Sequence, residues 1–461
     1  MITPVDLPNW ALLHASEHQD EHLNELLDLL RIPSVSTLSE HFGDVERAAN
    51  WIANQMKRIG LDGVQVLPTG GHPAVYGEWL DAPDCPTVLF YGHYDVQPPD
   101  PLDEWASPPF APQIRDGQIV ARGAADDKGQ LFTHLKAVES YLKTAGRLLV
   151  NVKFIIEGEE EIGSVHLGPF CRQHRDLLAA DVAVISDSHM FGLETPSIVY
   201  ALRGLTYMEV EVRGPSHDLH SGSYGGAIHN PAQVLCEIIA QLYDDQGRIT
   251  IPGFYDGVRP LSDEERAQLA DLPFDEAQFR QETGVSHTWG EAGYTVMEQI
   301  SARPTLDVNG MISGFTGEGA KTVLPAWARA KVSMRLTPDQ RAHDIAEKFR
   351  AYVESLAPDT VQVIVRELAG GEPAIVDTNI PAMQAASRAY EAGFGARPVF
   401  MREGGSIPVV GIFDEVLNLP SILMGFGLPD DRLHSPNEKL NVECFFRGIL
   451  TSIHFMAEYR A

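Results

Sequence analysis

The sequence predicts an α/β protein with a largely parallel sheet, interrupted in mid-chain by a second, α+β domain. In the first half of the chain, continuous apolar runs alternate with amphipathic helical segments. That pattern is typical of parallel strands buried on both faces. The apolar runs are 87–92, 150–156 and 182–186, and the expected helices are 21–30, 46–59, 128–142 and 166–179.

The pattern changes near residue 204, where apolar and polar residues begin to alternate as in strands with one wet face. The expected strands here are 206–214, 328–336 and 361–368, with helices at 231–243 and 339–356. Residues 247–305 are acidic and poorly periodic, and no element is assigned there. Because a helix resumes after about residue 376, we expect a main domain in two parts, 1–203 and 376–461, around an inserted domain at 204–375.

Composition limits the classes of function. The chain has 461 residues and a formal net charge of −29, which argues against nucleic acid or an anionic membrane as partner, because both need a basic surface. No apolar run reaches the ~18 residues of a membrane span, and the first thirty residues lack the features of a signal peptide. Four cysteines form neither a metal motif nor a disulfide framework, so we expect a cytoplasmic protein.

Polar clusters follow the apolar runs of the first domain. His93 and Asp95 follow the first run, four glutamates between 157 and 161 follow the second, and Asp187 follows the third. Asp126 and Asp127 stand just before the helix at 128–142. In parallel sheets the carboxyl ends of strands share one edge, where ligands bind. We therefore expect these side chains to meet.

Histidine and carboxylate donors at one site suit Zn²⁺ or Mn²⁺. Asp95 could orient His93 by accepting its second ring N–H, and His434, near the other end of the chain, is a further candidate donor. Taken singly, each cluster has an ordinary explanation: a local His–Asp pair, a solvated acidic loop, or a helix N-cap at Asp187. Their conjunction at successive strand ends favours a metal site.

Charge counting indicates two metal ions. Asp126, Glu161 and Asp187, together with one bridging hydroxide, balance two divalent cations. One glutamate is then free to act as a general base, although strand parity does not decide which glutamate binds metal. Two-metal sites polarise a carbonyl and generate hydroxide, so the residues predict a dinuclear hydrolase.

Nine motifs resemble the M20 family of metallopeptidases, and most closely its branch of cytosolic dipeptidases related to carnosinase. They occur in family order over about residues 90–440. The motifs are GHYDVQP (92–98), RGAADDKGQ (122–130), EGEEEIGS (157–164), ISD (185–187), DLHSGSYGG (218–226), GAKTVLP (319–325), SMRLTP (333–338), REGGSIP (402–408) and HSPNEKL (434–440).

The resemblance implies a division of roles at the metal site. His93 and Asp187 would complete one metal site, Glu161 and His434 the other, and Asp126 would bridge the two, followed by a cis peptide bond. Glu160 would be the general base that deprotonates the attacking water and passes the proton to the leaving amine. Metal-bound hydroxide would be the nucleophile.

The resemblance also implies roles in the inserted domain, which would serve as a lid and mediate a homodimer. His220 would reach the partner subunit's active site and stabilise the oxyanion. Arg335 would hold the substrate's terminal carboxylate in a bidentate pair, and Thr322 and Ser406 would contact substrate. The ordinary alternatives are a loop cap for His220, a surface ion pair for Arg335, and local backbone bonds for Thr322 and Ser406.

The sequence thus predicts an enzyme that cleaves dipeptides or short peptides with a free C-terminal carboxylate. Two readings remain beside it. One keeps the metals and changes the substrate, giving an N-acyl-amino-acid deacylase or carboxypeptidase of the same family. The other is a non-catalytic binding protein on a peptidase fold, against which the intact ligand set and Glu160 argue.

Overall fold

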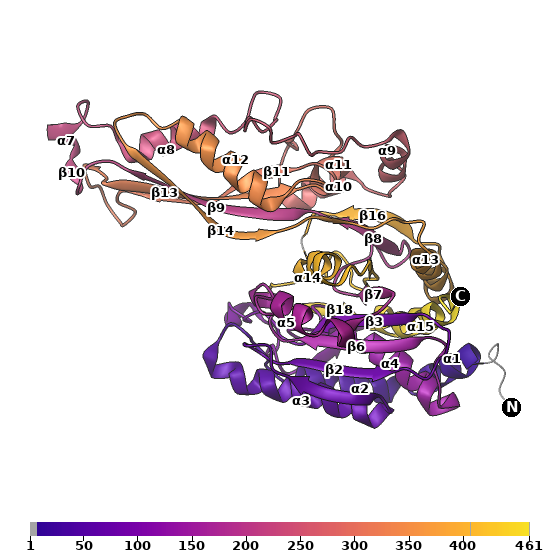
Figure 1. Cartoon of the computed structure of the whole chain (residues 1–461). Coiled ribbons are helices and arrows are strands. Elements are labelled where there is room, and N and C mark those ends of the chain that lie inside the picture. The colour runs from indigo at the N-terminus through magenta and orange to yellow at the C-terminus, as the bar shows by residue number, and fades with distance from the viewer. Residues whose placement is uncertain (1–6, 406, 461) are drawn as a thin grey trace. The chain divides into compact units, whose positions relative to one another are not determined.

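The computed structural model describes residues 7–405 and 407–460, and of Glu282 the backbone alone. The chain forms two compact units (Figure 1). Unit 1 holds the chain up to Tyr200, Val376–Met401 and the chain from Ile407 onward, and unit 2 holds Ala201–Ile375 and the short stretch that begins at Arg402.

The main sheet has a parallel core with antiparallel flanks. The strand order is β1 (Asp62–Leu67), β2 (Ala74–Trp79), β6 (Asn151–Glu157), β3 (Thr87–His93), β7 (Val182–Ile185), β17 (Ser421–Leu423) and β8 (Ser197–Leu202), and both β15 (Ala374–Ile375) and β16 (Val399–Glu403) pair with β8. Strands β6, β3, β7 and β17 run parallel, whereas β1, β2 and β8 pair antiparallel. The sheet is therefore mixed. The short link between β1 and β2 permits only an antiparallel turn, since a parallel crossover needs a dozen or more residues.

Strand β3 is covered on both faces, as its continuous apolar run predicts. Phe90 stacks on His134 of α4 with ring centroids 4.5 Å apart, and the next residue, Tyr91, meets Phe413 edge-on at 5.7 Å. Successive residues of a strand point to opposite faces, so α4 covers one face and the turn at Phe413–Leu417 covers the other.

The helices of unit 1 largely follow the predicted segments. α1, α4, α13 and α15 pack side by side, α3 packs on β1 and β2, and α5 packs on α14. Gly60 and Gly146 end α3 and α4 in the left-handed conformation, which glycine adopts readily. The expected helix at 166–179 breaks at His174. The helices are α1 (Leu7–Glu17), α2 (Gln19–Leu30), α3 (Phe42–Ile59), α4 (Lys128–Ala145), α5 (Leu167–Gln173), α6 (Arg175–Leu178), α13 (Pro381–Phe394), α14 (Pro408–Ile412) and α15 (Val442–Glu458).

Unit 2 is built on an antiparallel sheet with one covered and one wet face. The order is β11 (Thr305–Ser313), β13 (Trp327–Leu336), β9 (Gly204–Arg213) and β14 (Gln362–Gly371). Helices α8 (Pro231–Ala240) and α12 (Ala342–Ser355) pack on it over a core that includes Met208, Val332 and Phe349. The alternating strands expected here are confirmed.

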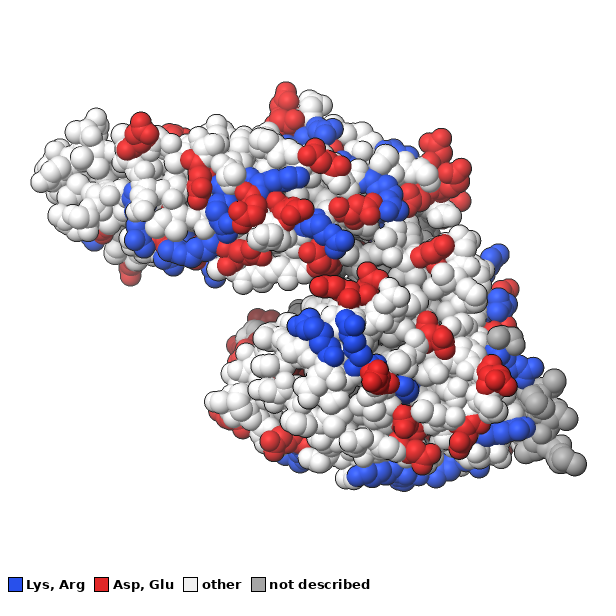
Figure 2. All heavy atoms as spheres, viewed as in Figure 1, with Lys and Arg blue, Asp and Glu red and all other residues white. Residues whose placement is uncertain are grey.

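The wet face carries paired charges. Arg366 donates to Glu209 at 3.0 Å and to Glu211 at 2.8 Å, and Arg329 donates to Glu211 at 3.2 Å. Figure 2 shows Lys and Arg interspersed with Asp and Glu over the strands of unit 2 in that view. Glu209 and Glu211 therefore both have basic neighbours, as in cross-strand charge pairs.

The segment 247–305 combines a few buried apolar residues, such as Ile251 and Phe254, with buried charge pairs. It contains α9 (Asp263–Ala270), α10 (Glu276–Thr283) and α11 (Val296–Ser301). Buried Arg303 makes two hydrogen bonds of 2.8 and 2.9 Å to buried Glu291 and lies 4.2 Å from the ring of Tyr294. Such bidentate and cation–π contacts leave no periodic signal in the sequence, which is why no element was predicted there.

Two small sheets complete the described strands. β4 (Gln113–Arg115), β5 (Gln118–Val120) and β18 (Lys439–Asn441) form one sheet, and β10 (Leu219–His220) pairs with β12 (Val323–Leu324). Cys85, Cys171, Cys236 and Cys444 are free thiols, of which Cys171 and Cys444 are buried. Within 7–405 and 407–460, the helices are either too short or too polar to cross a membrane.

Candidate metal centre

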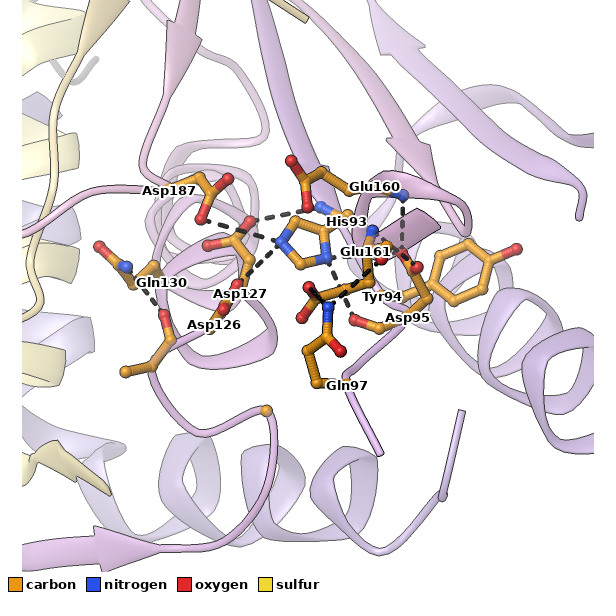
Figure 3. Close-up of polar contacts among 12 residues, drawn as sticks. His93, Tyr94, Asp95, Gln97, Asp126, Asp127, Gln130, Glu160, Glu161 and Asp187 are labelled. Carbon is orange, nitrogen blue, oxygen red and sulfur yellow. Dashed lines mark hydrogen bonds and ion pairs between the residues drawn. The ribbon is translucent and has the colours of Figure 1, made fainter. Parts of the chain in front are cut away.

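Three of the predicted ligands, His93, Glu161 and Asp187, lie at or just after the carboxyl ends of neighbouring parallel strands. His93 is the last residue of β3, Glu160 and Glu161 open the short 3₁₀ turn Glu160–Ile162 after β6, and Asp187 follows β7 by two residues. Strand β3 pairs with β6 on one side and with β7 on the other. The three strand ends therefore share one edge, and Figure 3 shows their side chains gathered there.

Six side chains form two groups that could each hold a cation. The first triad is His93, Glu160 and Asp187, and the second triad is Asp126, Glu161 and His434. In each triad, one donor atom from every residue lies within 4.8 Å of the others. Both triads offer the imidazole and carboxylate donors that zinc and manganese accept.

Asp126 connects the two triads. Its Oδ1 lies 3.1 Å from His93 Nε2, and its Oδ2 lies 2.9 Å from His434 Nε2. The two oxygens of one carboxylate thus face different histidines, as a bridging ligand requires. The peptide bond from Asp126 to Asp127 is cis, as the resemblance implied.

Asp95 orients the groups around it. Its Oδ1 and Oδ2 accept the backbone N–H groups of Glu160 and Glu161 at 3.2 and 3.1 Å. His93 Nδ1 lies 3.1 Å from the Asp95 carbonyl oxygen, which can only accept, so Nδ1 carries a proton, and Nε2, which faces Asp126, is the ring nitrogen that can bind a cation. Figure 3 shows Asp95 beside both glutamates.

The four glutamates of the run have different places. Glu157 accepts hydrogen bonds from Tyr91 Oη at 2.7 Å and Ser164 Oγ at 2.8 Å, and Glu159 accepts from the backbone of His72 at 3.1 Å. Both side chains are buried, so they anchor the turn. Glu160 and Glu161 are the two that enter the triads.

The electrostatics of the centre favour bound cations. Burial raises the pKa of Glu160 well above its usual range, and burial together with Asp126 raises the pKa of Glu161. Hydrogen bonds to Asp126 and Glu161 raise the pKa of His434 to about 10. For His93, burial opposes protonation, yet hydrogen bonds to Asp126 and other carboxylates raise its pKa well above normal. Divalent ions would relieve this crowding of carboxylates.

Three polar residues near the centre were not predicted from the sequence as site residues. Gln97 Nε2 donates to Glu161 Oε2 at 2.7 Å (Figure 3). Gln130 Nε2 donates to the carbonyl of Ala125 at 2.8 Å, and the Glu438 carboxylate accepts the backbone N–H of Asp126 at 3.1 Å. Each of the three lies within one of the nine motifs given above. Membership of a motif was the only feature of the sequence that could have identified them.

The remaining predicted residues belong to unit 2. His220 is exposed, and its Nδ1 accepts the Gly222 N–H at 3.0 Å, which caps the short helix Ser221–Tyr224. The carbonyl of Thr322 accepts the Ser221 N–H at 3.1 Å, so Thr322 lies beside His220. Arg335 is half-buried in β13, and burial lowers its pKa. Ser406 lies outside the described residues.

The comparisons with known proteins agree over nearly the whole chain. A family model described as Peptidase family M20/M25/M40 matches residues 89–458. The human Beta-Ala-His dipeptidase is 32% identical over 458 residues, covering 96% of this chain and 90% of that protein. The Cys-Gly metallodipeptidase DUG1 of Candida albicans is 31% identical over 456 residues, covering 94% of each chain.

Solved structures give the same picture. The structure of human carnosine dipeptidase 1 matches with a TM-score of 0.85 at 30% identity, covering 98% of this chain and 99% of that one. The M20 family metallo-carboxypeptidase Sso-CP2 from Sulfolobus solfataricus matches with a TM-score of 0.86 at 31% identity, covering 95% and 99%.

Proposed function

The chain belongs to the M20 family of peptidases, and from this premise we propose that it is a dipeptidase that works with two divalent metal ions. Its relatives are metallo-dipeptidases, hydrolases acting on peptide bonds. The finer substrate class that we propose is dipeptides or short peptides with a free C-terminal carboxylate.

One observation carries the proposal, namely that Asp126 presents separate oxygens to His93 and His434. A carboxylate in that position can serve two ions at once, and each triad supplies the remaining donors. We propose Zn²⁺ or Mn²⁺, because mixed imidazole and carboxylate donors suit both. Such ions, when bound, polarise a carbonyl and make water more acidic.

We propose Glu160 as the general base. Its carboxylate lies in the first triad, and its backbone N–H is fixed by Asp95. It would accept a proton from the attacking water and return it to the leaving amine. Since its position would also allow it to bind metal, metal content separates the two roles: a base can be replaced by glutamine with the metal retained.

We propose that unit 2 supplies substrate contacts. His220 Nδ1 accepts a backbone N–H, so the neutral ring carries its proton on Nε2. That nitrogen can donate to an oxyanion in the partner subunit's site. Arg335 would hold the terminal carboxylate, and Thr322 and Ser406 would contact substrate.

We propose a homodimer through unit 2, which would act as lid and dimerisation domain. Strand β11 is at the edge of its sheet and exposes Val308, Met311 and Ile312. An unpaired edge with exposed apolar side chains favours association with another chain. Size-exclusion chromatography with light scattering tests the dimer. Cytoplasmic location stays a prediction.

The experiment that tests the function is a dipeptide screen with added Zn²⁺ or Mn²⁺, on protein whose own metal content has been measured. We expect hydrolysis of Ala-Ala and little hydrolysis of N-acetyl-Ala. The reverse preference would favour a deacylase, and cleavage of long peptides one residue at a time would favour a carboxypeptidase, the activity named for Sso-CP2. Protein without metal and without activity after reconstitution would favour a binding role.

A further inference from the structure

Glu438 is a fully buried carboxylate whose two oxygens accept four hydrogen bonds. Oε2 accepts from Arg122 Nη1 at 2.8 Å and from the Gly123 N–H at 2.9 Å. Oε1 accepts from the N–H groups of Ala125 at 2.9 Å and Asp126 at 3.1 Å. All four donors belong to residues 122–126, the segment that ends in the connecting ligand of the two triads.

Glu438 itself belongs to the segment that carries His434. The two residues are four positions apart. Backbone hydrogen bonds also join this segment to the chain just before Asp126. The Ala121 N–H donates to the Glu438 carbonyl at 3.1 Å, and β18 pairs with β5. One side chain therefore links two of the three parts of the chain that supply the second triad, the part with Asp126 and the part with His434.

Gln130 holds the same loop from helix α4. Its Nε2 donates to the Ala125 carbonyl at 2.8 Å, and its Oε1 accepts the N–H groups of Phe426 and Gly427 at 2.6 and 3.2 Å. The Ala125 N–H is meanwhile bound by Glu438. The residue before Asp126 is thus held at both its N–H and its carbonyl.

Stability alone does not explain this arrangement. Burying Glu438 and Arg122 costs desolvation energy that a well-packed apolar pair would avoid. Each oxygen of Glu438 accepts two hydrogen bonds. Removing either oxygen would therefore leave buried N–H groups unpaired. What the arrangement does fix is the position of the Asp126 backbone relative to the chain near His434.

We propose that Glu438 is a positioning residue that holds Asp126 and His434 in register, so that one carboxylate can serve both triads, and that Gln130 assists it from α4. The inference rests on the proposed two-metal function. Among the described residues, the hydrogen bond that joins the Glu438 carboxylate to a proposed metal ligand is the one from the Asp126 backbone N–H, and Glu438 acts through that backbone.

The test compares metal binding by wild type, Glu438→Gln and a control, Glu443→Gln. Glu443 pairs with Arg447 on the exposed first turn of α15, so its variant makes the same charge change away from the centre. In Glu438→Gln, an NH₂ group replaces one acceptor and faces N–H donors. We expect Zn²⁺ affinity, measured by competition with a chromophoric chelator, to fall about 10–100-fold, and Glu443→Gln to match wild type.

A second measurement separates positioning from a merely structural effect. Metal binding stabilises the folded state by an amount that grows with the logarithm of the affinity, so the rise in Tm on adding Zn²⁺ should shrink in Glu438→Gln but not in Glu443→Gln. A structural role would lower Tm equally with and without metal. Unchanged affinity and an unchanged Zn²⁺-induced rise in a folded Glu438→Gln protein would overturn the proposal.

If Glu438→Gln does not fold, Gln130→Ala decides the question. We expect it to lose Zn²⁺ affinity in the same direction, by less, and wild-type affinity would then overturn the proposal. Failure of the underlying function looks different, because wild-type protein would then bind no metal or hydrolyse no dipeptide. Wild type that binds two ions and hydrolyses dipeptides, alongside variants with unaltered affinity, removes the positioning role alone.

Discussion

Carboxylates gather in two regions of this molecule, and the regions differ in what surrounds them. On the wet face of unit 2, Glu211 lies among arginines, and hydrogen bonds from Arg366 and Arg213 lower its pKa to about 2. At the edge of the main sheet, the ion pairs of the two triads are all with histidine among the residues that the structure describes, and the pKa values of Glu160 and Glu161 are raised by burial.

The difference teaches how to tell a stabilising charge network from a cation site. Arginine is always protonated, so an acid beside it is already balanced. Histidine can lose its proton and bind a metal. Acids paired with histidine and with neutral donors, as Glu161 is with His434 and Gln97, are therefore placed to receive a cation from solution.

The largest effect is expected from a change at Glu160, in the proposed cation site. Replacing Glu160 by Gln keeps the size of the side chain and removes its ability to take a proton. We expect kcat to fall about 10²–10⁴-fold, with metal content unchanged by elemental analysis. Glu159→Gln is the neighbouring control, because Glu159 bonds His72 and His166 instead of a triad. Wild-type kcat in Glu160→Gln would remove the assignment.

The number of bound metal ions gives a second test of the cation site. Asp126→Asn should lower the binding affinity for both ions by more than about 100-fold. This is more than the usual effect of changing a residue that only supports a ligand. Glu161→Gln should release one ion, because Glu161 belongs to the second triad alone. Elemental analysis after gel filtration gives the count. Two ions retained by Asp126→Asn would show that this carboxylate does not connect the sites.

Variants of two arginines in β13, Arg335 and Arg329, distinguish a role in substrate binding from a surface ion pair. Arg335→Ala should lower kcat/KM for dipeptides about 10–150-fold, the loss of a charged hydrogen bond. C-amidated dipeptides should be hydrolysed equally by the variant and by wild type. Arg329→Ala, which removes an ion pair to Glu211, should leave both substrates unaffected. Equal hydrolysis of free and amidated peptides by wild type would contradict a carboxylate-binding Arg335.

The smallest expected effect tests the balanced network. Because the folded state lowers the pKa of Glu211, its contribution to stability is complete above the unfolded value of about 4.3 and is lost as pH falls towards 2. Glu211→Gln should lower Tm by about 2–4 °C at pH 7, and the difference from wild type should vanish near pH 2. A constant difference across that range would mean that packing, rather than charge, stabilises this face.

The sequence predicted the centre better than it predicted the loops around it. The apolar runs locate β3, β6 and β7, and the polar residues after them predicted that His93, the glutamate run and Asp187 lie at one edge, because strand ends are defined by local pattern. The family resemblance, which is confirmed, selected Glu161 from the glutamate run and predicted that His434, already a candidate donor, binds the same ion. The antiparallel flanks of the sheet were missed, since pairing direction depends on link length and distant partners.

Other features had no local signal. The segment 247–305 depends on contacts such as Glu291–Arg303 and Arg303–Tyr294, which periodicity does not reveal. Glu438 and Gln130 are ordinary polar residues in sequence, and their roles depend on the fold of the chain around Asp126. The roles proposed for His220, Arg335 and Thr322 in unit 2 stay predictions.

The order of the chain has a consequence for synthesis. Strand β17, helix α15 and His434 all come after the segment that forms unit 2. A ribosome therefore releases Asp126 and Glu161 long before their histidine partner and before the strand that extends the parallel core beyond β7. Translation stopped before residue 421 would yield a polypeptide with the first triad's residues but with neither β17 of the main sheet nor the histidine of the second triad.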